Sequence, residues 1–245
     1  MSKERNELKA YIEASIDEKF EREAVIRKTE TSRVYLYRHK ESGKRIIQRH
    51  SKNRNDDVYR ILRNKRLCSL PQIYEVCSDD DWLMVLEEYI DGKNLAAVTD
   101  SGTLKTKQAC KYAYDICNAL TELHTLGIIH RDIKPANVII NGNNEAVLID
   151  LNIARSVSES DDKDTASLGT VGYAAPEQYG ISQSGKSTDI YALGVLLNIM
   201  ITGVHPAINS PKGPIKHIIQ KATNVQISRR YQSAKEMQKE LRLYI

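Results

Sequence analysis

Four polar side chains near the middle of the chain have the types and spacing that phosphoryl transfer requires. Asp132, Lys134 and Asn137 lie within one short stretch, and Asp150 follows thirteen residues after the last of them. A carboxylate and an amide oxygen suit a hard cation such as Mg²⁺, which takes few protein ligands. A second carboxylate nearby can accept a hydroxyl proton, and a lysine adds positive charge. We therefore expect Asn137 and Asp150 to bind metal and Asp132 to accept the proton.

A hairpin is the element that must bring the two expected metal ligands together. Two apolar, β-branched runs, 138–140 and 146–149, flank the sequence Asn-Gly-Asn-Asn, which is strong turn chemistry. Antiparallel pairing of Ile140 with Ala146 places Asn137 beside Asp150 at the open end of the ladder. The sequence thus predicts one metal site next to one proton acceptor.

Residues 130–137 read His-Arg-Asp-Ile-Lys-Pro-Ala-Asn, which resembles the catalytic loop of the eukaryotic-type (Hanks-type) serine/threonine protein kinases. Gly-Thr at 169–170, Ala-Pro-Glu at 175–177 and Asp-Ile-Tyr-Ala-Leu-Gly at 189–194 follow in the order of that family. The sequence Gly-Tyr-Ala-Ala-Pro-Glu-Gln around Glu177 is most similar to that of kinases of Gram-positive bacteria. The resemblance implies ATP and Mg²⁺ as cofactors and a protein Ser/Thr hydroxyl as the acceptor.

The same resemblance implies an α+β, two-lobed kinase-like fold with a small β-rich lobe and a large, mainly helical lobe. We expect a helical extension over 1–24, the small lobe over 25–90 and the large lobe over 91–245. Periodicity and turn residues predict the individual elements. They are helices over 4–24, 57–65 and 104–126, and strands over 25–37, 44–49, 71–76 and 82–86.

Three further residues acquire structural roles from the resemblance. Glu177 and Arg230 match the buried ion pair of the family, and removing one partner of such a pair leaves the other charge buried. Asp189 matches the carboxylate that holds the backbone of the catalytic loop. The loop 156–167 is polar and acidic, and we expect any autophosphorylation between Ser156 and Thr170, with Arg131 available to a phosphate there.

The part of the small lobe that we expect to bind phosphate departs from the family. The three glycine positions of the first hairpin fall on Arg27, Thr29 and Ser32, so the close backbone approach that glycine permits is lost. Arg49 stands in place of the phosphate-binding lysine and keeps its charge with a different shape. The partner glutamate of the following helix is replaced by Val58, and the alternative is that Asp57 serves if the helix rotates.

The adenine end of the expected nucleotide site also differs from the family. Ile47 stands where a small alanine would border adenine, and added methylene groups crowd a packed site. Residues 87–92 resemble the hinge of the kinase family. The resemblance implies that backbone groups near Glu88 and Ile90 would contact the edge of adenine. The complete set of expected nucleotide contacts is Val34, Ile47, Arg49, Glu88, Ile90 and Ile139.

Bulk properties argue against several classes of partner. The chain has 245 residues with 36 basic and 32 acidic side chains, and its net charge of +4 is not gathered into a basic arm, so nucleic acid is not expected. The polar start does not resemble a signal peptide, and the longest apolar run, 190–201, is too short to span a bilayer. Cys68, Cys77, Cys110 and Cys117 lack zinc-type spacing, so we expect reduced thiols and a cytoplasmic location.

Three functions stay open from the sequence. The first is a working serine/threonine protein kinase with weakened nucleotide binding, because the large-lobe residues are all present. The second is a pseudokinase that acts as a binding scaffold, because several small-lobe elements are lost and each lost donor costs about 10²–10³ in rate. The third, a small-molecule phosphotransferase, fits Lys134 and the 169–177 segment less well.

Overall fold

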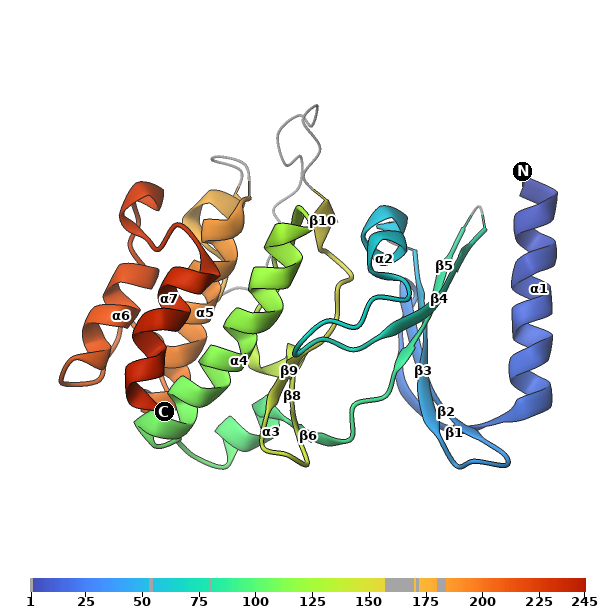
Figure 1. Cartoon of the computed structure of the whole chain (residues 1–245), viewed down its shortest axis with the longest axis horizontal. Coiled ribbons are helices and arrows are strands. Elements are labelled where there is room, and N and C mark those ends of the chain that lie inside the picture. Colours follow the sequence, from blue (N-terminus) through green and yellow to red (C-terminus); the bar gives the residue numbers. More distant parts are fainter. Residues whose placement is uncertain (1, 53–54, 80, 157–169, 171, 180–183) are drawn as a thin grey trace. The chain divides into compact units, whose positions relative to one another are not determined.

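A computed structural model describes residues 2–52, 55–79, 81–156, 170, 172–179 and 184–245 (Figure 1). The chain divides into two compact units. Unit 1 consists of Met1–Arg66 and Pro71–Ile90, and unit 2 consists of Leu67–Leu70 and Asp91–Ile245. Each unit is described below by itself.

Unit 1 is built on a five-stranded antiparallel sheet in the order β1-β2-β3-β5-β4. Strands β2 to β5 each bury apolar side chains, whereas β1 is mostly charged and exposed and is held by its ladder to β2. The strands are β1 (Phe20–Lys28), β2 (Ser32–His39), β3 (Arg45–Ser51), β4 (Ile73–Ser78) and β5 (Leu83–Glu88).

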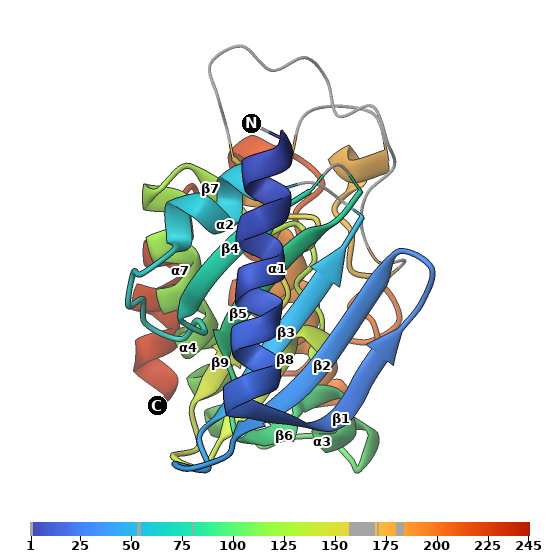
Figure 2. The same ribbon diagram turned by 90° about the vertical axis from the view of Figure 1, so that its right-hand side faces the viewer.

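Two helices complete unit 1, and both are shorter than the sequence predicted. Helix α1 (Ser2–Lys19) runs alongside the sheet in Figure 2 and ends before 24, because Phe20 already pairs with His39 in the β1–β2 ladder. Helix α2 (Asp56–Leu62) ends before 65 because Arg63 is extended and Asn64 has a φ of 61°. The ladder and the turn therefore outweigh the helical periodicity at these ends.

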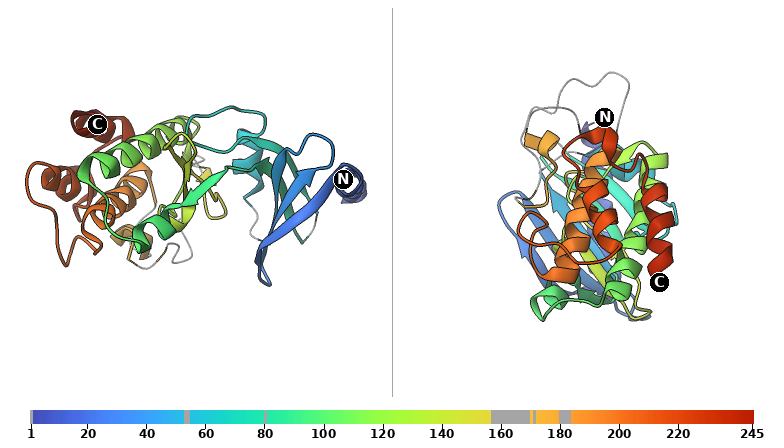
Figure 3. Two further views of the ribbon diagram at one scale, coloured as in Figure 1. Left: turned by 90° about the horizontal axis from the view of Figure 1, so that it is seen from below. Right: turned by 90° about the vertical axis from the view of Figure 1, so that its left-hand side faces the viewer.

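Unit 2 is mainly helical. The two views of Figure 3 show α7 beside α4, and α4 also packs on α5, which in turn packs on α6. Most of α5 is fully buried, as its nearly continuous apolar sequence requires. The helices are α3 (Leu95–Asp100), α4 (Thr106–Thr125), α5 (Lys186–Thr202), α6 (Ile215–Ala222) and α7 (Ala234–Leu241).

Short strands and single 3₁₀ turns connect these helices. The strands are β6 (Gly92–Asn94), β7 (Ile128–Ile129), β8 (Val138–Asn141), β9 (Ala146–Leu148) and β10 (Arg155–Ser156). The 3₁₀ turns are η1 (Pro135–Asn137), η2 (Pro176–Tyr179), η3 (Ile227–Arg229) and η4 (Arg242–Tyr244). Within the described part of the chain, no helix has the length and apolar character needed to cross a bilayer.

The hairpin β8–β9 has the predicted register. Ile140 pairs with Ala146, and the ladder extends by one further bond from the Ile149 N–H to the Asn137 carbonyl, at 2.9 Å. Strand β6 pairs with β8 on the other side, and the pairing requires glycine at Gly92. A Cβ there would lie 2.2 Å from the Ile140 carbonyl oxygen. The hairpin is thus fixed from both sides directly after the catalytic-loop sequence.

Candidate active site

The carboxylate of Asp132 is the centre of a polar cluster in unit 2. Its Oδ2 accepts hydrogen bonds from Lys134 Nζ at 2.7 Å and from Asn137 Nδ2 at 2.8 Å. Its Oδ1 accepts from the hydroxyl of Thr170 at 2.7 Å, and the same hydroxyl accepts from Lys134 Nζ at 2.8 Å. Asp132, Lys134 and Thr170 therefore form a closed triangle of charge-assisted hydrogen bonds.

Asp132 stays ionised and keeps room for one more donor. Burial raises the pKa of this carboxyl, but the hydrogen bonds from Lys134 and Thr170 outweigh burial and hold the pKa below its ordinary range. An ionised carboxylate offers about four acceptor positions. The described residues fill three of them, so a substrate hydroxyl can donate to the fourth.

The backbone of the catalytic loop is held in a costly conformation at Arg131. Its φ is 71°, a left-handed value that costs a residue other than glycine of order 1–3 kcal/mol. Its peptide N–H donates to Asp189 Oδ1 at 2.8 Å, and its carbonyl accepts from Gln178 Nε2 at 3.0 Å. Two side chains from outside the loop therefore maintain the turn that precedes Asp132.

Asp189 is the more buried of these two holding groups. It lies at the start of α5 with no exposed surface, and its Oδ2 accepts from the His130 N–H at 2.9 Å and bonds to His124 Nε2 at 2.8 Å. Burial raises the pKa of Asp189, but the hydrogen bonds from His124 and the loop backbone outweigh it and lower the pKa. The carboxylate is therefore ionised where it grips the loop.

The predicted metal ligands have a chemistry that fits Mg²⁺. Asn137 Nδ2 donates both to the Asp132 carbonyl at 2.9 Å and to the Asp132 carboxylate, so the amide nitrogen must face Asp132. The amide oxygen is then the atom that Asn137 can offer to a cation. Asp150 follows the hairpin with a φ of 69°, a left-handed value.

Glu177 and Arg230, 53 residues apart, form a bidentate ion pair inside unit 2. Arg230 Nη1 and Nη2 donate to the two carboxylate oxygens at 2.7 and 2.9 Å, and the two side chains are 0% and 3% exposed. The Thr188 hydroxyl donates to the same carboxylate at 3.0 Å. The other N–H groups of the guanidinium donate to the backbone oxygens of Ser187, Asn224 and Val225.

The tip of the first hairpin in unit 1 lies where the family has its glycines. The Thr29 N–H donates to the Ser32 carbonyl at 2.8 Å, and the Ser32 N–H donates to the Thr29 hydroxyl at 3.0 Å. Arg27 lies in the β1–β2 ladder opposite Val34. Because these two amide groups already have partners within the turn, they do not form a ready anion cradle.

Arg49 has a partner that the sequence did not suggest. Its Nη2 donates to Glu87 Oε1 at 2.9 Å, and each of the two side chains is 7% exposed. Helix α2 is the element that supplies the partner carboxylate in the family. In this chain the side chain of Val58 on α2 lies in the core and is 1% exposed, whereas Asp57 is exposed. The hypothesis of a rotated helix with Asp57 on Arg49 is therefore wrong, because β5 provides the carboxylate instead.

Comparison with known proteins agrees with these features. The family described as "Protein kinase domain" matches residues 20–244. The chain belongs to the protein kinase family. It is 30% identical over 221 residues to the serine/threonine-protein kinase PrkC of Bacillus subtilis, covering 78% of this chain and 34% of that protein. It is 36% identical over 127 residues to the serine/threonine-protein kinase PknB of Mycobacterium leprae, covering 51% of this chain and 20% of that protein.

A plant relative, mitogen-activated protein kinase kinase 7 of Arabidopsis thaliana, is 31% identical over 166 residues, which is 66% of this chain and 50% of that protein. The chain thus spans half or less of the length of these three curated relatives. The bacterial serine/threonine kinase relationship and the α+β class predicted from the sequence are both confirmed.

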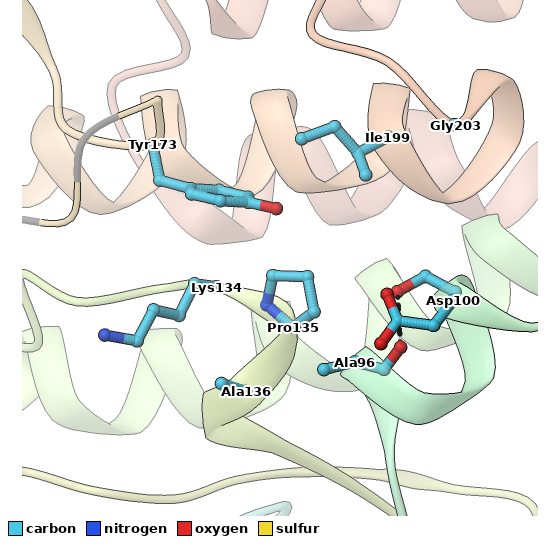
Figure 4. Close-up of a pocket in the computed structure, with 9 residues that line it drawn as sticks. Ala96, Asp100, Lys134, Pro135, Ala136, Tyr173, Ile199 and Gly203 are labelled. Atoms are coloured by element: carbon cyan, nitrogen blue, oxygen red, sulfur yellow. Dashed lines mark hydrogen bonds between the residues drawn. The ribbon is translucent and has the colours of Figure 1, made fainter.

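A pocket of about 300 Å³ adjoins the catalytic loop of the kinase domain, entirely within unit 2 (Figure 4). Figure 4 shows Tyr173 and Ile199 on one side and Pro135 and Ala136 on the other, with Asp100 at one end. Burial raises the pKa of Tyr173, and the charge of Asp100 raises it further, so the phenol is neutral. The lining comprises Ala96, Thr99, Asp100, Lys134, Pro135, Ala136, Tyr173, Ile199 and Gly203.

The expected nucleotide contacts of the kinase domain fall in both units. In unit 1, Val34 and Ile47 pack with Leu36 in one apolar cluster, and Tyr89 packs against it. The Glu88 N–H donates to the Gln72 carbonyl at 2.9 Å, so this amide is not available to adenine. Ile90 is the last residue of unit 1, whereas Ile139 lies on β8 in unit 2. These contacts remain a prediction.

Sequence reasoning missed two residues of the kinase site, Gln178 and Glu87 in its pair with Arg49, and it gave a third residue, Thr170, no role at Asp132. Thr170 closes the triangle on Asp132 from 38 residues away, and Gln178 holds the Arg131 carbonyl from 47 residues away. Glu87 holds Arg49. A usable signal existed for Thr170, which belongs to the Gly-Thr motif of the family pattern, and for Glu87, a charged residue near the end of an apolar strand. The expected phosphorylation loop lies mostly outside the described residues.

Proposed function

We propose that this chain is a serine/threonine protein kinase that transfers the γ-phosphoryl group of ATP to a protein Ser or Thr hydroxyl. One observation carries the proposal: the ionised Asp132 carboxylate has one acceptor position left in a cluster of three donors. A hydroxyl that donates to this position would be oriented for attack and could release its proton to Asp132 as the reaction proceeds.

The other residues have distinct roles in this proposal. Lys134 bonds to Asp132 and Thr170, so its ammonium is fixed where negative charge develops during transfer. Asn137 and Asp150 would hold Mg²⁺, which when bound neutralises charge on the phosphate oxygens. Asp189 and Gln178 hold Arg131 in its left-handed conformation and thereby set the position of Asp132.

The pocket beside the catalytic loop supports a polypeptide acceptor over a small molecule. It has mostly apolar walls, and Lys134 belongs both to its lining and to the Asp132 cluster. A side chain near the phosphorylated residue could enter it while the hydroxyl reaches Asp132. A small hydroxyl compound would leave this space unfilled and would gain nothing from it.

Weakened, metal-dependent nucleotide binding is part of the proposal. The amides of Thr29 and Ser32 already have partners, and Arg49 offers a broad planar guanidinium in place of the compact lysine ammonium. Unit 1 therefore offers the phosphates less attraction than a glycine-rich loop with a lysine would. ATP affinity should accordingly fall sharply in EDTA.

Incorporation of labelled phosphate from Mg-ATP into myelin basic protein tests the enzymatic proposal, with mass spectrometry of the chain itself as a second readout. Transfer that disappears in Asp132→Asn supports it. Any autophosphorylation is expected between Ser156 and Thr170, the range that the sequence predicts. Absence of transfer by the folded parent would leave the scaffold as the better function.

A pseudokinase scaffold is the second candidate, and the hairpin tip whose amides bond within the turn is the observation that favours it. It predicts no phosphotransfer and a melting temperature unaffected by Mg-ATP. A cytoplasmic location is proposed for either function. The four free cysteines, three of them buried, support it, and fractionation of cells that express the chain would test it.

A further inference from the structure

The buried pair of Arg49 and Glu87 is formed by two neighbouring strands. The β3–β5 register sets Ile47 opposite Glu87 and Arg49 opposite Val85, so Arg49 and Glu87 are diagonal neighbours. Side chains two residues apart on a strand share a face, and long diagonal partners are within reach of each other. The 2.9 Å contact is therefore a direct product of the sheet register.

The surroundings of this pair are apolar. Val34 lies opposite Arg49 on the other flanking strand, and Ile47 belongs to the same apolar cluster. A guanidinium in such surroundings is costly without a carboxylate, so Glu87 contributes to fixing where the Arg49 guanidinium lies. Helix α2 contributes the apolar side chains of Val58, Tyr59 and Leu62 to the core of unit 1.

We propose that Glu87 is the positioning residue for Arg49 and orients it toward the phosphates of the nucleotide. The carboxylate that positions Arg49 therefore comes from strand β5 and not from helix α2. The inference rests on the proposed function, because it takes ATP as the ligand. The ladder between β3 and β5 keeps Arg49 in place whatever the orientation of α2. Rotation of α2 should therefore not switch phosphate binding on or off in this chain.

Calorimetric titration with ATP and with adenosine, both in Mg²⁺, tests the role of Glu87 in the parent and in Glu87→Gln. Adenosine lacks phosphates, so it reports on the fold and on the adenine slot. The expected result is an about tenfold weaker ATP affinity in Glu87→Gln with adenosine affinity unchanged, because a charge-assisted hydrogen bond no longer fixes Arg49. Equal losses for both ligands would overturn the positioning role.

Asp57→Asn is the matched control, since Asp57 is the carboxylate that the helical alternative would use. It should leave both affinities unchanged, and a selective loss of ATP affinity in this variant would overturn the proposal. If Glu87→Gln does not fold, the double variant Arg49→Met/Glu87→Met removes both charges together and leaves none stranded. It should bind adenosine as the parent does and ATP more weakly.

The outcome separates this inference from the proposed function. A parent that binds ATP more tightly than adenosine yet transfers no phosphate would overturn the enzymatic proposal alone. A parent that transfers phosphate but whose ATP affinity is insensitive to Glu87→Gln and to the double variant would overturn the positioning role alone.

Discussion

Unit 1 and unit 2 both bury an arginine–glutamate pair, but the two pairs are built differently. Arg230 joins segments on either side of α5 and α6, and its five N–H donors all have partners in unit 2. Arg49 on β3 pairs with Glu87 on the adjacent strand β5. The first pair is a structural tie with no donor left for a ligand, whereas the second lies beside the apolar cluster where nucleotide contacts are expected.

The contrast extends to the residues around each pair. In unit 2 the catalytic loop is held by α5 and by η2, and its carboxylate retains an acceptor position. In unit 1 the hairpin tip satisfies its own amides. We infer that unit 2 carries the chemistry and that unit 1 limits nucleotide affinity.

Asp132→Asn should have the largest effect, and it tests whether unit 2 carries the chemistry. The change keeps the shape of the side chain but removes the proton acceptor, so phosphotransfer should fall by about 10²–10⁴-fold. Labelled phosphate incorporation measures the loss, and the melting temperature should stay close to that of the parent. Asp17→Asn, an exposed aspartate in α1, is the control and should leave transfer unchanged. Full activity in Asp132→Asn would contradict the assignment.

Glu177→Ala tests the structural tie of unit 2. Arg230 would keep its buried position without its carboxylate, which should lower the free energy of unfolding by about 3–5 kcal/mol. Urea denaturation measures the change. Glu21→Ala removes the partner of Arg38 from an ion pair whose side chains are 51% exposed, and it should have no measurable effect. Equal effects of the two substitutions would break the comparison.

Ile199→Asp tests whether the pocket of unit 2 receives a substrate side chain. A charge on this apolar wall should raise the KM for a protein substrate by about tenfold, because one lost apolar contact is worth about 1–3 kcal/mol. The KM for ATP should not change. The exposed apolar residue Ile208 offers the control Ile208→Asp, which should alter neither constant. A change in the KM for ATP alone would contradict this role.

The smallest expected effect at neutral pH concerns acid stability. Burial raises the pKa of Glu177, but hydrogen bonds from Arg230 and Thr188 outweigh it, so the folded pKa lies below the ordinary 4.5. The unfolded chain then binds this proton more readily, and stability from Glu177 is complete above about pH 4.5 and is lost as pH falls through the folded pKa. When the free energy of unfolding is measured as the pH is lowered, it should decline less steeply in Glu177→Gln than in the parent.

Local patterns predicted the catalytic loop and the hairpin register because the residues that determine them are adjacent in sequence. The turn residues at 141–144 allow one register in which the two apolar runs pair with each other. The ends of α1 and α2 were wrong, because ladder pairing of Phe20 and the backbone of Arg63 depend on tertiary context. The α+β class followed from the kinase motifs and is confirmed.

The partners of the charged groups could not be predicted from sequence alone. Arg49 and Glu87 are 38 positions apart, as are Asp132 and Thr170, so only the fold brings them into contact. The family pattern directed attention to α2, where the sequence left Asp57 as an alternative partner, but the structure pairs Arg49 with Glu87 of β5. The roles of the individual site residues and the domain boundaries remain predictions that the experiments above address.

The grip of Asp189 on the catalytic loop has a consequence for hydrogen exchange. The amide protons of His130 and Arg131 bond to a carboxylate with no exposed surface at the start of α5, most of which is buried. Such protons exchange with solvent only when the surrounding core opens. The segment before Asp132, although it has no regular secondary structure, should therefore exchange as slowly as the interior of α5. The proposed proton acceptor is thus attached to one of the slowest-opening parts of unit 2.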